Sequence, residues 1–114
     1  MTEDRELLEM AAKAAGLVVH GWVGDEMAWY DPSTGLNGRG DWNPLSDDGD
    51  ALRLAVKRHI NYRICADQTI SGSEQTGKDS ARMIQEWFAD HRGDPYAATR
   101  RAIVRAAAAM ADQT

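Results

Sequence analysis

The chain has 114 residues, of which 43% are hydrophobic and 27% charged, and its formal net charge is −5. This length predicts one domain, residues 1–114, with a core that needs no metal ion or disulfide. The negative charge argues against a general affinity for nucleic-acid phosphates. Cys65 is the single cysteine and the first residues are acidic, so neither an internal disulfide nor a signal peptide is expected. No apolar run reaches the ~20 residues of a membrane span. We therefore expect a cytoplasmic protein.

Residues 3–15 predict the first helix. Its acidic residues stand at the start, where the helix dipole favours them, and Thr2 is the expected N-cap. Gly16 is suited to end the helix in a left-handed conformation. The apolar stripe of this helix is narrow and rich in alanine, which would let the helix lie close to a sheet.

A β-hairpin is predicted next. Residues 17–23 and 27–30 are rich in β-branched and aromatic side chains, and residues 24–26 supply a short turn between them. Residues 31–35 have strong turn chemistry. The glycine-rich stretch 35–40 then predicts a loop.

A second helix is expected to begin after Leu45, with Ser46 or Asp47 as its N-cap. Residues 60–66 alternate between apolar and polar side chains, which predicts a third strand. The apolar side of the second helix, which precedes this strand, is expected to consist of Leu52, Ala55, Val56 and His59.

The remaining elements are less uniform. Residues 67–80 are polar and predict a long loop, whereas residues 82–89 fit either a helix or a strand. Asp94 followed by Pro95 is a typical helix start, and this last helix is expected to run to about Met110.

Three features resemble sites for phosphate binding, metal binding or acid–base catalysis, but none of them matches such a site. Residues 72–79 approach the P-loop pattern, but Asp79 stands where a magnesium-binding hydroxyl is needed. The three histidines and Cys65 are too scattered for a usual zinc site. His91 beside Asp90 is the only adjacent acid–base pair noted, and neighbours in sequence rarely share a catalytic geometry. We assign no catalytic, cofactor-binding or metal-binding residue.

Charge and aromatic residues favour a protein partner instead. Residues 41–50 carry acids without a base, and residues 53–63 carry bases without an acid, which is typical of recognition surfaces but also of a helix matching its own dipole. Of four tryptophans, two or three are expected in the core, and one beside the glycine-rich loop could anchor a partner. The candidate partner-binding residues are Trp29, Arg39, Asp41 and Trp42.

Several stretches of the chain resemble the phage ABA sandwich domain family, a group of small proteins encoded by tailed bacteriophages and prophages. They are residues 42–45, 47–56 and 93–106, with a further likeness at residues 5–16. The resemblance implies an α+β fold, an α/β/α sandwich with the order α-β-β-α-β-β-α around a four-stranded, mainly antiparallel sheet. It also favours a strand at residues 82–89, and it carries over no functional residues.

Three functions are compatible with these observations. The first is a phage or prophage accessory protein that binds and inhibits a host protein in the host cytoplasm, for example in an anti-CRISPR role. The second is a regulator that binds nucleic acid through basic helix faces, and the third is an enzyme with an active site formed only on folding. The basic residues available for the second function are Arg53, Lys57, Arg100, Arg101 and Arg105.

Overall fold

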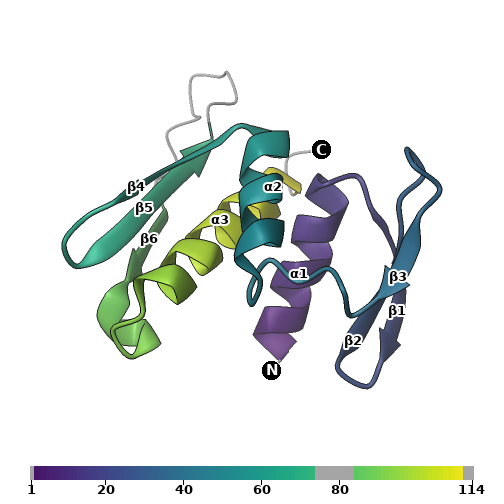
Figure 1. The fold of residues 1–114 in the computed structure, drawn as a ribbon, viewed down its shortest axis with the longest axis horizontal. Coiled ribbons are helices and arrows are strands. Elements are labelled where there is room, and N and C mark those ends of the chain that lie inside the picture. Colours follow the sequence, from purple (N-terminus) through teal and green to yellow (C-terminus); the bar gives the residue numbers. More distant parts are fainter. Residues whose placement is uncertain (1, 74–83, 112–114) are drawn as a thin grey trace.

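The computed structural model describes residues 2–73 and 84–111, and in this part of the chain three α-helices lie between two three-stranded antiparallel sheets (Figure 1). The fold class is therefore α+β. The elements in chain order are α1 (Thr2–Ala14), β1 (Val18–Val23), β2 (Glu26–Tyr30), β3 (Asn37–Arg39), α2 (Asp48–Arg58), β4 (Ile60–Ile64), β5 (Gln68–Ser73), β6 (Ile84–Trp87), the 3-10 helix η1 (Phe88–His91) and α3 (Pro95–Ala111). Sheet A has the order β1-β2-β3, and sheet B has the order β4-β5-β6.

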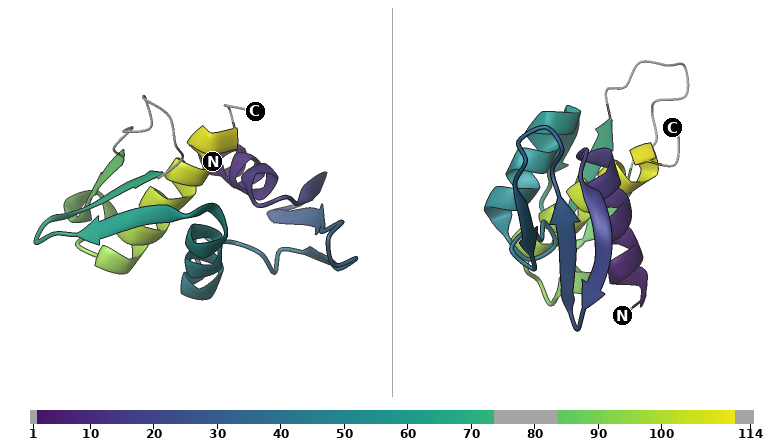
Figure 2. Two further views of the ribbon diagram at one scale, coloured as in Figure 1. Left: turned by 90° about the horizontal axis from the view of Figure 1, so that it is seen from above. Right: turned by 90° about the vertical axis from the view of Figure 1, so that its right-hand side faces the viewer.

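The layering differs from the predicted sandwich. A single four-stranded sheet between helices was expected, whereas the helices form the middle layer and the two sheets lie outside them (Figure 2). Each sheet is built only from strands that follow one another in the chain. Since α1 packs on sheet A and α3 packs on sheet B, the paired helices separate the sheets and prevent them from joining.

The predicted helix ends are largely confirmed. Gly16, at φ +85°, follows α1, and its N–H and that of Leu17 donate to carbonyls of the last turn, as in a Schellman motif. The α1 helix begins at Thr2 itself, so Thr2 is its first residue and not its cap. Asp47 caps α2 by accepting the Asp50 N–H at 2.8 Å. Asp94 caps α3, because its Oδ1 accepts the Tyr96 N–H at 2.9 Å.

Two strands lie in stretches where loops were expected. The glycine-rich stretch contains β3, which pairs with β2. The polar stretch 67–80 begins with β5, whose inward side chains Thr69 and Ser71 are buried although they are hydroxylic. Their hydroxyls are satisfied by α3: Thr69 Oγ1 lies 2.8 Å from Thr99 Oγ1, and Ser71 Oγ donates to the Ala102 carbonyl at 2.7 Å.

The ambiguous stretch 82–89 forms a strand at residues 84–87, as the family resemblance favoured. Ile84 and Glu86 are buried, whereas the alternate residues Gln85 and Trp87 are exposed, so the side chains follow the period of a strand. The apolar residues there are spaced as in a helix, but Glu86 occupies an inward position and hides the alternation. Residues 74–83 lie outside the described part, and with them most of the P-loop-like run.

Two apolar clusters form the core. The larger one joins the three helices to sheet B, and the smaller one, made of Leu8, Ala12 and Met27, joins α1 to sheet A. Partly buried Leu17, Trp42 and Leu45 contact both clusters. On α3 most buried residues are alanines, so this helix can approach its neighbours closely.

We predict that Asp94→Ala lowers the free energy of unfolding by about 1 kcal/mol, because the first turn of α3 loses its side-chain acceptor. Asp94→Asn is the matched control and should stay near wild type, since asparagine caps equally well. Urea unfolding followed by circular dichroism measures both. Equal losses in the two variants would show that the charge of Asp94, and not its capping, stabilises the helix.

Candidate functional site

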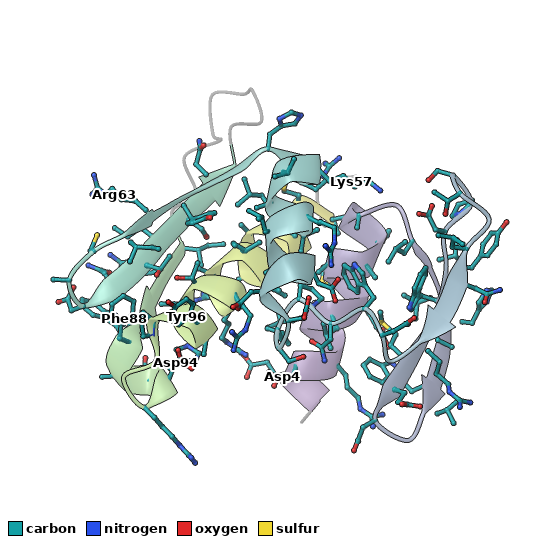
Figure 3. The ribbon with its side chains drawn as sticks, in the orientation of Figure 1. Asp4, Lys57, Arg63, Phe88, Asp94 and Tyr96 are labelled. Carbon is teal, nitrogen blue, oxygen red and sulfur yellow. The ribbon has the colours of Figure 1, made fainter. Side chains whose placement is uncertain are left out.

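A groove of about 440 Å³ opens between α2, β4 and the start of α3. Its exposed apolar side chains are Leu52 on α2, Tyr62 and Ile64 on β4, and Tyr96 on α3. Asp48 and Arg100 are its charged lining residues, and they form an ion pair at 2.7 Å. We call this feature the α2–β4 groove. Tyr96 lies in the first turn of α3, next to its cap Asp94 (Figure 3).

The apolar surface continues along α2 beyond this groove. A shallower hollow of about 370 Å³ shares Leu52 and Tyr62 with the groove and adds Val56 near the end of the helix. Val56 is 68% exposed and Tyr96 is 67% exposed, which is high for large apolar residues on neighbouring elements. Contiguous apolar surface of this kind marks binding sites on soluble proteins.

The strand period explains why β4 contributes apolar residues to the groove. Tyr62 pairs with Ser71, and Ile64 pairs with Thr69, so both share the inner face of sheet B. Thr69 and Ser71 are covered by α3, and so is Ile60 at the start of β4, but Tyr62 and Ile64 further along β4 stay exposed. The alternation in residues 60–66 predicted the strand correctly, although it did not show that this face would stay open.

The predicted apolar side of α2 is only partly correct. Ala51, Leu54 and Ala55 are the apolar residues of α2 buried in the core, whereas Leu52 lines the groove and Val56 lines the neighbouring hollow. His59 is the C-cap of the helix, in a left-handed conformation at φ 55°. The sequence signal for this site was a wide apolar stripe on α2, wider than the core requires.

The outer edge of β4 is also open. In the described part of the chain, β4 pairs with β5 and with no other strand. The Cys65 N–H donates to the Gln68 carbonyl at 2.8 Å, and bonding pairs alternate along an antiparallel ladder. The main-chain groups of Arg63 therefore face β5, while those of Tyr62 and Ile64 face away from it. Figure 3 shows the Arg63 side chain on the far side of β4 from the helices.

The structure brings three of the four predicted partner-binding residues together on sheet A and the segment after it. Trp29 Nε1 donates to Asp41 Oδ1 at 2.9 Å, and Arg39 pairs with Glu26 at 3.1 Å. Trp42 is partly buried and packs against both core clusters. Trp29 or Trp42 was expected to be the exposed tryptophan, but Trp87, with 43% of its surface exposed, is more exposed than either.

A second polar site surrounds the buried carboxylate of Glu86. His91 Nε2 lies 2.7 Å from Glu86 Oε1, and Arg105 donates to Glu86 Oε2 at 2.6 Å. Arg101 approaches Oε2 at 3.7 Å and bonds Asp4 of α1 at 2.8 Å. Burial acts to lower the pKa of Arg101, but the hydrogen bond and charge of Asp4, together with the charges of Glu86 and Glu3, raise that pKa overall, so the guanidinium stays charged. Both oxygens of Glu86 have partners, and we interpret this network as a structural link between β6, α3 and α1.

The basic residues considered for nucleic-acid binding are mostly neutralised. Arg53, Arg100, Arg101 and Arg105 each form an ion pair with at least one carboxylate. Of the five residues in this set, only Lys57 has no ion pair within the described part of the chain, so the set offers little uncompensated positive charge for phosphates. Among the described residues no three metal-ligating side chains come together, and no helix there combines the length and apolar character of a membrane span.

Replacing Trp42 should reveal a role in packing. We predict that Trp42→Ala lowers the free energy of unfolding by about 3 kcal/mol, because it opens a cavity where the two core clusters meet. Trp87→Ala, at an exposed position on β6, should cost about 1 kcal/mol. Thermal and urea unfolding compare the two variants. A loss for Trp42→Ala no greater than that for Trp87→Ala would contradict a packing role.

We also predict that Glu86→Ala lowers the free energy of unfolding by about 2 kcal/mol, since it leaves Arg101 and Arg105 without their shared acceptor. Asp25→Ala breaks a solvent-exposed pair with Arg5 and is the matched control, with a change near zero. Similar results for both variants would mean that the Glu86 network contributes nothing.

No family model, curated protein or solved structure matches this chain. The likeness to the phage ABA sandwich domain family therefore stays a prediction from short stretches of sequence. The function has to be argued from the surface itself, and its most distinctive feature is the α2–β4 groove.

Proposed function

We propose that this protein is a binding module that captures another protein in the α2–β4 groove. The observation that carries the proposal is the cluster of Leu52, Tyr62, Ile64 and Tyr96, four large apolar side chains left exposed around one hollow. Tyrosines in such hollows are typical anchors of protein interfaces, because they bury a large area with few rotatable bonds.

The chemistry of the groove favours a protein over a small polar ligand. Its walls are mainly apolar, and its charged lining residues, Asp48 and Arg100, already neutralise each other. An apolar partner surface gains from leaving water there, while this ion pair supplies polar contacts at the rim. The groove lies away from the Glu86 network, which occupies the side of α3 facing α1 and β6.

The family resemblance supplies a biological setting for this binding. In that setting the protein is a phage or prophage accessory protein, and its partner is a bacterial protein in the host cytoplasm. Blocking a defence protein, as anti-CRISPR proteins do, is the form of inhibition that we propose first. Occupying a partner's working surface requires no catalytic residue.

The test is a pull-down from bacterial lysate with folded variants. We predict that Leu52→Asp weakens partner capture by about tenfold or more, because it places a charge in an apolar contact. Tyr96→Ala should weaken capture similarly by removing an anchor. Recovery of the bound protein is measured by quantitative mass spectrometry against wild-type bait.

The matched control is Leu36→Asp, the same substitution at an exposed leucine next to sheet A. Its capture should equal that of wild type. Loss with Leu36→Asp but not with Leu52→Asp would move the binding surface to sheet A, near the predicted residues Trp29, Arg39 and Asp41. Capture that disappears after nuclease treatment would favour the nucleic-acid function.

A further inference from the structure

The α2–β4 groove and the unpaired edge of β4 belong to the same strand. We propose that the captured partner supplies an extended segment that adds to sheet B as a fourth strand beside β4. This inference rests on the proposed function and specifies how the partner is recognised. The occupant is an acidic segment of another protein, with apolar residues at every second position.

The main chain of β4 is arranged for such an addition. The N–H and C=O groups of Tyr62 and Ile64 point away from β5, as the alternation from the Cys65–Gln68 bond requires. An added antiparallel strand forms hydrogen bonds with every second residue of its neighbour, and Tyr62 and Ile64 are spaced in this way. Such bonds provide affinity without depending on the partner's side chains, whereas the groove provides selectivity.

The side chains of the added strand would cover what sheet B now leaves open. Neighbouring strands lie about 4.8 Å apart, so a fourth strand would lie about that far from β4, on the side away from β5. Its inward side chains would meet Leu52 and Val56, which flank β4 on α2. Because only every second side chain points inward, the partner needs apolar residues in alternation.

Charge selects an acidic partner. Residues 51–66 contain four bases and no acid, in a chain whose net charge is −5. Arg53 is paired with Asp50, but among the described residues the other three bases form no ion pair. Arg63 stands on the outer face of β4, and within the described residues neither it nor Arg58 forms an ion pair. An acid on the outward side of the added strand would lie across from Arg63. A second copy of β4 would bring another arginine and no acid, so the charges favour a different protein.

The experiment selects binders from a displayed library of random linear peptides, using the full chain as bait. The proposal expects enriched peptides that alternate apolar and acidic residues. Their binding should slow hydrogen exchange of the Tyr62 and Ile64 amides, measured by NMR, by about tenfold or more, because these amides gain acceptors. N-methylation of alternate peptide amides should abolish binding in one register and spare it in the other, since only one set of amides faces β4.

A variant of the protein tests the same contact from the other side. Ile64→Pro removes an N–H that faces the open edge and bonds no residue of β5, so the strand can keep its ladder. Peptide binding should fall by about tenfold or more with an unchanged circular dichroism spectrum. Ile64→Val, which retains the N–H and a β-branched side chain, is the control and should bind as wild type. If the proline variant unfolds, the exchange rates in wild-type protein still decide the matter.

The outcomes separate this inference from the proposed function. Peptides that require Leu52 but leave the Tyr62 and Ile64 amides unprotected, or that bind as helices, overturn strand addition only. Peptides that bind equally well to Leu52→Asp overturn the groove itself. A library without binders overturns recognition of a linear segment, while the pull-down still tests the groove. A protein that sediments as a dimer with those amides already protected shows that a second copy holds the edge, and it also overturns the inference.

Discussion

The enclosure of α3 is the constraint on which the rest of this structure depends. The helix packs on α1 and α2 on one side and on all three strands of sheet B on the other. A helix buried on so many sides must carry small side chains, and α3 does so with alanines at most of its buried positions. The contact is close enough for Ser71 of β5 to donate a hydrogen bond to the main chain at Ala102. A larger side chain at Ala102 would push the sheet away and break that bond.

The open groove follows from the width of sheet B. Its strands cover α3, and the main contact of α2 with the sheet is at β4. Ala51, Leu54 and Ala55 of α2 find cover in the core, but Leu52 and Val56 do not. These two exposed apolar residues lie beside β4, the edge strand of sheet B. A further strand beside β4 would cover them.

The sequence predicted what local chemistry determines. The hairpin, the caps at Asp47 and Asp94, and the glycine after α1 depend on a few neighbouring residues, and each was placed within a residue or two. The strand β5 was missed because Thr69 and Ser71 look like loop residues until α3 supplies their hydrogen-bond partners. The separation of the two sheets was missed for a related reason. Which strands pair depends on which helices lie between them, and no local pattern encodes that arrangement.

Tertiary packing also explains why the site was not predicted from the sequence. Trp42 attracted attention as an aromatic residue beside glycines, yet its surroundings come from both core clusters, which are distant in sequence. Leu52 and Val56 were assigned to the core because they share a helical stripe with Ala55. Their exposure depends on where sheet B ends, and that edge is set by the pairing of β4 with β5, which the pattern of α2 alone does not show.

The two cores are unequal, and this has a consequence for how the molecule opens. Sheet A is held to α1 by the cluster around Leu8, Ala12 and Met27, together with the bonds from Trp22 to Glu9 and from Arg5 to the Gly24 carbonyl. The larger cluster contains no buried residue of sheet A and is joined to the smaller one only through partly buried residues such as Leu17, Trp42 and Leu45. We therefore expect sheet A to detach at a lower free energy than unfolding of the whole chain requires. Partial opening of this kind would expose its tryptophans to solvent while α3 and sheet B remain folded.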